Sequence, residues 1–255
     1  MATVYHLGLA KEQIKNASYA FLPGDPFRCP IIAQKLDKNY GEISWKREYR
    51  SCLGELSGVK VLVTSTGIGG SSTSIAIDEL ASLGIKTFIR IGTTGSIQKR
   101  IKAGDVIITT GAVRLDGTST HYAPIEYPAV ADFEITSALV EAAENLRIKY
   151  HLGITASSAT FYPGQERYDS FSKYVIKKFQ GSLKEWQRLN VLNYEMESST
   201  LLTMCSALGL KAGSIAGVVV ERTKEENIER KVVKKAEKNA VRVAIKGMQL
   251  LILKL

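Results

Sequence analysis

The chain has 255 residues, a length that favours one large α/β domain over two small ones. Hydrophobic residues make up 45% and charged residues 23%, as in ordinary globular proteins, and no apolar run reaches the about 18 residues that a membrane-spanning helix needs. The net charge of +9 is spread along the chain and mixed with acidic residues, so it favours binding of small anions over nucleic acid.

Strand-like and helix-like segments alternate along most of the chain. In chain order we expect strands at 20–22, 59–66, 87–92, 105–113, 151–157 and 211–220, and helices at 71–83, 133–146, 168–179, 198–208 and 225–250. The last helix would present an apolar stripe that includes Val233, Ala240 and Val243 to a sheet. This alternation predicts an α/β fold with a mostly parallel or mixed sheet covered by helices, in a single domain that spans residues 1–255.

The cysteines and the first residues bear on the compartment. Cys29, Cys52 and Cys205 are odd in number and far apart, and no CxxC occurs, so we expect neither a disulfide framework nor a zinc site. Residues 1–6 lack the basic and apolar regions of a signal peptide. We therefore expect a cytoplasmic protein.

Glycine-rich polar segments follow three of the expected strands, at residues 23–26, 67–70 and 92–95. In α/β sheets the ligand lies beyond the carboxyl ends of the strands, so these segments predict the mouth of a site. No GxxxxGK[ST] motif occurs, and the run at Gly67 lacks the GxGxxG spacing. A triphosphate P-loop is thus disfavoured, and a dinucleotide fold is only weakly supported.

Two of these segments suggest an anion site. Arg90 lies near the end of an otherwise apolar strand, where a buried guanidinium needs a partner. A bound phosphate would supply it, with Arg28 nearby and with the Gly24 N–H and the Thr93 hydroxyl completing the cradle. The alternatives are a structural ion pair for Arg90 and plain turn geometry for the glycines.

At residues 193–200 a strand is expected to end and a helix to begin. The helix dipole alone could account for a carboxylate at Glu197. Alternatively, Glu197 accepts hydrogen bonds from the vicinal hydroxyls of a sugar, with Met196 as an apolar surface below the ring. Glu195 and Glu197 could also suggest glycoside hydrolysis, but that chemistry normally pairs carboxylates from separate elements.

Residues 160–168 place an aromatic ring, an amide and a guanidinium in one short Pro-Gly turn. Phe161 can stack on a flat ring, Gln165 offers a donor and an acceptor, and Arg167 adds a fixed fork of donors. Uracil requires this combination, because its N3–H donates and its O2 and O4 accept. A surface turn before an ordinary polar helix is the alternative.

Together these motifs resemble those of the uridine phosphorylase family, in the nucleoside phosphorylase/nucleosidase superfamily. The resemblance runs from residue 4 to about residue 223. Its most specific segments are 22–26, 65–70, 90–95, 113–117, 160–168 and 193–202. One region departs from the pattern: Glu221 stands where relatives more often have asparagine, and the charged segment 224–230 lacks their usual proline.

The resemblance implies a mixed, partly barrel-like sheet flanked by helices, and a pentosyltransferase activity. The reaction would be reversible phosphorolysis of uridine, and of 2′-deoxyuridine or thymidine, to uracil or thymine and a pentose 1-phosphate in pyrimidine salvage. Inorganic phosphate would be the co-substrate, and no cofactor would be required. The family acts as homodimers, usually assembled into hexamers, and some members hold a potassium ion at the dimer interface, at positions matching Glu48, Ile68 and Ser72.

The resemblance also implies roles for individual residues. Phosphate would be bound by Gly24, Arg28, Arg90 and Thr93, and by Arg47 from a neighbouring subunit. Ribose would be bound by Thr93, Met196 and Glu197, and by His6 from the neighbour. Uracil would be bound by Phe161, Gln165, Arg167, Val219, Val220 and Arg222. The catalytic residues would be Arg90, Arg167 and Glu197.

Other activities remain as alternatives. Purine enzymes of this architecture place an aspartate in the strand-end segment, which here reads Val-Val-Glu-Arg at 219–222. A nucleosidase would not need Arg28, Arg47 and Arg90 together. A non-catalytic nucleoside sensor would gain nothing from a phosphate subsite. If the protein instead bound nucleic acid, its affinity for DNA or RNA would fall steeply with salt concentration.

Overall fold

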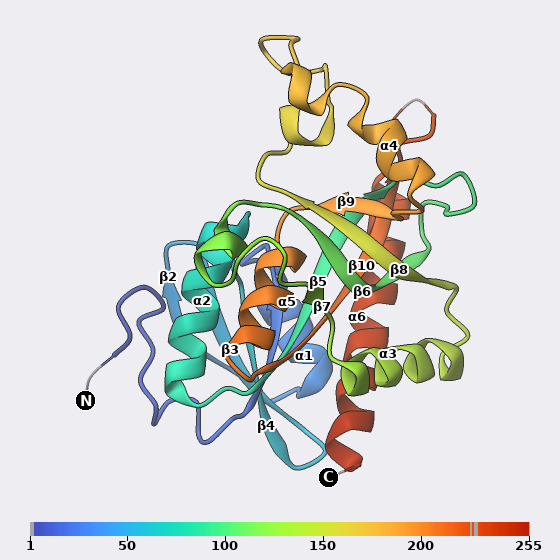
Figure 1. The fold of residues 1–255 in the computed structure, drawn as a ribbon. Coiled ribbons are helices and arrows are strands. Elements are labelled where there is room, and N and C mark those ends of the chain that lie inside the picture. The colour runs from blue at the N-terminus through green and yellow to red at the C-terminus, as the bar shows by residue number, and fades with distance from the viewer. Residues whose placement is uncertain (1–2, 225, 227–228, 255) are drawn as a thin grey trace.

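The computed structural model describes residues 3–224, 226 and 229–254 (Figure 1). The strands are β1 (Tyr19–Pro23), β2 (Gly41–Lys46), β3 (Tyr49–Leu56), β4 (Val59–Thr64), β5 (Thr87–Ser96), β6 (Val106–Leu115), β7 (Ala129–Val130), β8 (Tyr150–Ser158), β9 (Asn193–Glu195) and β10 (Lys211–Glu221). The helices are α1 (Arg28–Leu36), α2 (Gly70–Leu83), α3 (Phe133–Asn145), α4 (Ser182–Arg188), α5 (Ser198–Ala207) and α6 (Arg230–Leu253). Short 3₁₀ turns are η1 (Thr118–His121), η2 (Pro163–Gln165) and η3 (Lys177–Phe179).

All the strands belong to one mixed sheet, part of which closes on itself. β10 pairs with β5 in parallel and with β6 antiparallel, β6 and β9 each pair in parallel with β8, and β9 returns antiparallel to β5. These pairings form a closed ring of five strands. β1 extends the sheet in parallel between β5 and β4, and β3 and β2 follow antiparallel. The predicted mixed, partly barrel-like sheet is therefore confirmed.

Helices cover the sheet in two layers (Figure 1). Apolar side chains of α1, α3 and α6 form one buried cluster with the strands, and those of α2 and α5 form another. Close approach of α6 to β10 depends on Gly217, because a Cβ there would lie 2.5 Å from the Ala236 carbonyl oxygen. Among the helices of the described residues, none is both long and apolar enough to cross a membrane.

The predicted helix at 168–179 is wrong. That segment is irregular and ends in η3, and it belongs to an excursion that projects from the barrel (Figure 1). Of its apolar side chains Val175 is buried, but Phe171 is fully exposed and Tyr168 and Tyr174 are about half exposed, so the segment offers no continuous buried face. A hydrogen bond connects the two ends of this excursion: the backbone N–H of Leu183, at the start of α4, donates to the Glu166 carboxylate at 2.7 Å.

Two other expectations need adjustment. The last helix begins at Arg230 rather than at 225, and residue 225 lies outside the described residues. The elements α1, β2 and β3 were not expected from the sequence. β2 and β3 form a hairpin whose turn carries Arg47 with a φ of 56°. β2 alternates polar and apolar residues through Ile43 and Trp45, but the stretch is short and none of its residues is buried.

Candidate active site

A cavity of about 790 Å³ opens at the carboxyl ends of β1, β4, β5 and β10, which all run in the same direction. This is the edge of the sheet that the glycine-rich segments predicted. The predicted site residues that line it are Gly24, Arg28, Arg90, Thr93, Phe161, Gln165, Arg167, Met196, Glu197, Val219 and Val220. Segments far apart in the sequence therefore meet around one space.

A second hollow of about 500 Å³ lies along β6, β8 and the loop that precedes β7. Its arginine, Arg114, donates to the carbonyls of Ala123, Pro124 and Tyr127, and to the Ser119 hydroxyl. Because this guanidinium is already occupied in holding the loop, the hollow is the weaker candidate for an anion site.

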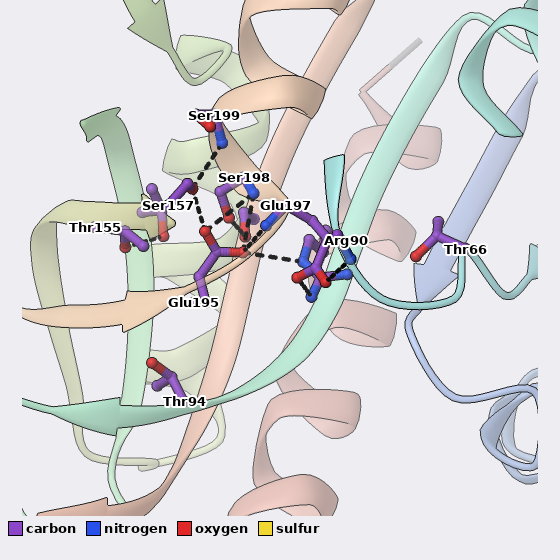
Figure 2. A network of polar contacts seen from close by, with 12 residues as sticks. Thr66, Arg90, Thr94, Thr155, Ser157, Glu195, Glu197, Ser198 and Ser199 are labelled. Carbon is purple, nitrogen blue, oxygen red and sulfur yellow. Dashed lines mark hydrogen bonds and ion pairs between the residues drawn. The ribbon is translucent and has the colours of Figure 1, made fainter. Parts of the chain in front are cut away.

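Arg90 lines the larger cavity. It projects from β5 and is only 6% exposed. Its Nη2 pairs with the Glu197 carboxylate, and its Nε lies 3.4 Å from Glu195 Oε2 (Figure 2). Its Nη1 is buried and has no hydrogen-bond partner among the described residues. The structural ion pair considered for Arg90 is therefore present, and the N–H groups of Nη1 are left for a ligand.

Glu197 is the N-cap residue of α5, yet its side chain makes no capping bond to the helix. Instead it accepts the backbone N–H of Gly69 at 2.6 Å and pairs with Arg90. Burial raises the pKa of Glu197, while the charge of Arg90 opposes that rise. The Glu197 carboxylate therefore lines the cavity and contacts Gly69 and Arg90, so the helix dipole alone does not account for it.

Glu195 was given no role from the sequence, but its carboxylate accepts hydrogen bonds from several neighbouring residues. Its carboxylate accepts from the Ser157 hydroxyl and from the backbone N–H groups of Glu197 and Ser198, both at 2.9 Å (Figure 2). The available signal was a second carboxylate two residues before Glu197.

Around the predicted base subsite, two arginines and a carboxylate form a cluster. The Arg167 guanidinium lies 4.4 Å over the Phe161 ring, and its Nη1 pairs with Glu226 Oε2 at 2.7 Å. Arg222 Nε pairs with Glu226 Oε1 at 3.0 Å. Gln165 is only 3% exposed. Glu226 was not predicted, because its charged segment carries no pattern that would place it over these arginines.

Arg222 itself is not part of the cavity wall, although it was predicted to contact uracil. Its guanidinium lies behind Gln165 and 5.3 Å from the centre of the Tyr194 ring. Burial and the neighbouring Arg167 lower the pKa of Arg222. It donates to the Gln165 backbone carbonyl at 2.8 Å, and its contact with uracil stays a prediction.

Glu221, the departure from the family pattern, does not line the cavity either. It pairs with Lys102 and Lys224 and accepts the Ala103 N–H at 3.3 Å. Burial would raise the pKa of this carboxyl, but these partners lower it. The acidic residue holds the end of β10 to a neighbouring turn.

At the predicted anion site, the glycine-rich segments contact one another. The Gly67 N–H donates to the Gly24 carbonyl at 3.0 Å, and a Cβ at Gly24 would lie 3.2 Å from the Gly67 carbonyl oxygen. Arg28 lines the cavity but pairs with Glu237 of α6. The second predicted guanidinium is therefore partly neutralised.

His6 and Arg47, predicted to act in a neighbouring subunit, do not line this cavity. The His6 ring lies 2.7 Å from Glu79, and Arg47 is exposed at the tip of the β2–β3 hairpin. Their contribution to a second subunit stays a prediction.

The predicted cation ligands Glu48, Ile68 and Ser72 lie together at the cavity. The Ser72 hydroxyl donates to the Ile68 carbonyl at 3.1 Å. A carboxylate, a carbonyl and a hydroxyl are the oxygen ligands that hard cations take, so the residues fit such an ion. In the described part of the chain, no group of three or more His, Cys, Asp or Glu residues could hold a metal ion.

Comparison with known proteins identifies the class. Residues 18–250 match the model of the phosphorylase superfamily. The chain is 56% identical over 252 residues to the uridine phosphorylase of Haemophilus influenzae, across 99% of this chain and 100% of that protein. It is 54% identical to the uridine phosphorylase of Escherichia coli, across 98% of each, and 45% identical to that of Thermococcus kodakarensis, across 97% of this chain and 86% of that one. The chain belongs to the phosphorylase superfamily, and the resemblance to uridine phosphorylases is confirmed.

Proposed function

We propose that this protein is a pentosyltransferase that catalyses reversible phosphorolysis of uridine, and of 2′-deoxyuridine or thymidine, in pyrimidine salvage. The observation that carries the proposal is the spare buried donor of Arg90 beside the Glu197 carboxylate. A site built for a nucleoside and an anion needs both groups, one for phosphate and one for sugar hydroxyls. Nearly full-length similarity to uridine phosphorylases supports the choice of base.

In the proposed reaction the C1′–N1 bond of uridine breaks and a phosphate oxygen bonds to C1′. The electron pair of the broken bond leaves with uracil as a delocalised anion, which then takes a proton. Positive charge develops on the sugar, and phosphate held by Arg90, Arg28, Gly24 and Thr93 stabilises it. Fixed charges aimed at developing charge, together with positioning of two substrates, supply the catalysis.

The sugar and the base would be held at the other walls of the cavity. Glu197 would accept the vicinal hydroxyls of ribose, with Met196 and Thr93 beside the ring. Gln165 and Arg167 would donate to the uracil carbonyls and stabilise the leaving anion. Phe161, Val219 and Val220 would enclose the ring, and all three line the cavity.

The proposal includes an assembly. The whole chain would form one nucleoside phosphorylase domain, and a homodimer would be the active unit, assembled into a cytoplasmic hexamer. His6 and Arg47 would complete the neighbouring subunit's sites for ribose and phosphate. Glu48, Ile68 and Ser72 would hold a potassium ion at the dimer interface, where the ion would neutralise the carboxylate.

The test is uracil release from uridine with and without inorganic phosphate. Arg90→Ala should cost about 2–4 kcal/mol of transition-state stabilisation, the scale of one preorganised charge contact. Arg188→Ala, at an exposed position of α4, is the matched control. Equal release in phosphate-free buffer would exclude phosphorolysis, and a preference for inosine over uridine would indicate a purine enzyme instead.

A further inference from the structure

Glu195 and Glu197 are two carboxylates beside one arginine, and their hydrogen bonds differ. Glu195 Oε1 accepts from the Ser157 hydroxyl and, at 3.1 Å, from the Ser198 N–H. Its Oε2 accepts the N–H groups of Glu197 and Ser198, both at 2.9 Å, and lies 3.4 Å from Arg90 Nε. A carboxylate offers about four acceptor positions, so Glu195 is saturated by the protein itself.

The Glu197 carboxylate has fewer hydrogen-bond donors around it than it can accept. Within the described residues its partners are the Gly69 N–H, on Oε1, and Arg90 Nη2, on Oε2. About two of its four acceptor positions therefore remain for hydroxyl groups of a ligand. Although both side chains line the cavity, only one of these carboxylates can accept hydrogen bonds from a sugar.

The start of α5 explains how Glu197 keeps this freedom. The first N–H groups of a helix lack partners within the helix, and the side chain of the N-cap residue commonly accepts one of them. Here Glu195 accepts from the N–H groups of Glu197 and Ser198, and Ser157 Oγ accepts from that of Ser199 at 2.8 Å (Figure 2). Glu197, the N-cap residue, is relieved of capping.

The same carboxylate fixes Arg90. Glu195 occupies the Nε edge of the guanidinium, and Glu197 occupies Nη2. With these two edges taken, the planar group cannot turn about its Cδ–Nε bond without loss of these contacts, and Nη1 is the nitrogen left without a partner among the described residues. Figure 2 shows the contacts of the guanidinium with both carboxylates.

We propose that Glu195 is a positioning residue: it orients Arg90 toward phosphate and Glu197 toward the sugar, and it contacts neither substrate. This inference rests on the proposed phosphorolysis. The inference goes beyond the proposed reaction because it assigns substrate binding to Glu197 and the positioning of other site residues to Glu195.

The test variant is Glu195→Gln, which keeps the shape of the side chain. Its amide retains one oxygen for the α5 N–H groups but turns an NH₂ donor toward Arg90 Nε, so the guanidinium is released. Loss of a hydrogen bond to a charged group predicts a rise of about 10- to 100-fold in the KM for phosphate. The ratio of kcat/KM for uridine over 2′-deoxyuridine should stay within about twofold of the wild-type ratio, because the amide oxygen still accepts the α5 N–H groups and so leaves Glu197 free for the sugar.

Glu197→Gln is the matched comparison. It changes the residue assigned to the sugar hydroxyls, so it should lower the uridine to 2′-deoxyuridine ratio by about fivefold or more. If Glu195→Gln lowers that ratio as far as Glu197→Gln does, Glu195 binds the sugar and the inference is overturned. An unchanged KM for phosphate in Glu195→Gln would overturn it equally.

A double-variant cycle tests whether Glu195 acts through Arg90. Arg90→Lys removes the Nε that Glu195 holds, so Glu195→Gln should then change the phosphate KM by less than about twofold. Independent effects that multiply in the double variant would contradict the inference. Should Glu195→Gln fail to fold by circular dichroism, Glu195→Asp carries the same measurements, because its shorter carboxylate also withdraws from Nε.

Two separate measurements distinguish failure of the proposed function from failure of the inference about Glu195. Uracil release by the wild-type protein tests phosphorolysis, whereas calorimetric titration with inorganic phosphate alone tests the state of Arg90 without a nucleoside. Weaker phosphate binding by Glu195→Gln in that titration supports the inference even if uridine is not the substrate. Unchanged phosphate binding, with active wild-type protein, overturns the inference and leaves the proposed function standing.

Discussion

Arg222 Nη2 donates to the backbone carbonyl of Gln165 at 2.8 Å, between residues 57 positions apart in the chain. Both residues are more than nine-tenths buried. This bond joins the end of β10 to the turn η2, so the strand that closes the barrel also sets the position of the predicted base subsite.

Arg222→Ala should therefore weaken uridine binding more than phosphate binding. Removal of a charged donor leaves the Gln165 carbonyl unpaired, at a cost of about 1–3 kcal/mol, which corresponds to a rise of about 5- to 150-fold in the KM for uridine. Steady-state kinetics with each substrate varied in turn, beside the exposed Arg188→Ala control, measure this. A parallel rise in the phosphate KM would mean that the whole cavity had shifted.

Base choice should depend on Gln165 and Arg167. Cytosine presents an unprotonated N3 and an exocyclic amine where uracil has a donor and a carbonyl, so cytidine in the same pose would meet two mismatches. Each buried mismatch costs about 1–3 kcal/mol, which predicts discrimination of at least about 10²-fold. The measurement is kcat/KM for uridine and cytidine; discrimination that survives Gln165→Ala with Arg167→Ala would place base recognition elsewhere.

Arg47 should act across a subunit boundary. If it does, mixing inactive Arg47→Ala protein with inactive Arg90→Ala protein restores activity, because a mixed dimer regains one intact site. Tagged chains verify that subunits exchange. Exchange without rescue would show that both arginines serve the same subunit's cavity, or that Arg47 serves none.

Asp116 should stabilise the fold in a pH-dependent way. This buried carboxylate accepts from the hydroxyls of Ser199, Thr200 and Ser119. Burial would raise the pKa of Asp116, but these hydrogen bonds lower it below its usual 3.8. A lowered pKa in the folded state means stability that is present above the unfolded pKa and lost as pH falls through the folded one.

We expect Asp116→Asn to lower the free energy of unfolding by about 2–4 kcal/mol at pH 7, given the strength of hydrogen bonds to a charged group. The difference from wild type should shrink as pH falls below about 4. Urea unfolding at several pH values measures it, with the exposed Asp169→Asn as control. A difference that does not change with pH would indicate that shape rather than charge is what Asp116 supplies.

The parts of the fold with strong local patterns could be predicted from the sequence. Val59–Thr64, which follows Gly58, and the stretch 87–91, which precedes Gly92, are rich in apolar and β-branched residues, and both lie in strands. The segment 168–179 has an amphipathic pattern but forms no α-helix, because it projects from the barrel where Phe171 is left fully exposed. The ring closure between β10 and β5 was implied only by the family resemblance, since strand pairing across that distance has no local signal.

The site divides in the same way. Arg90 and Glu197 could be predicted because a charged residue in a buried strand, or at a strand-to-helix junction, requires a partner. Glu226 could not, since its place over Arg167 and Arg222 depends on how the chain returns after β10. The different duties of Glu195 and Glu197 likewise depend on which N–H groups each faces, and two glutamates two residues apart look alike in a sequence.

The ring closure also has a consequence for synthesis of the chain on the ribosome. β5 emerges early, but β10, which covers one of its edges, emerges near the end. Until then β5 and β6 present open edges that can pair with other nascent chains. The Val219–Val220 wall arrives with the same strand, so truncation before β10 should yield aggregation-prone protein without a base subsite, rather than a smaller active enzyme.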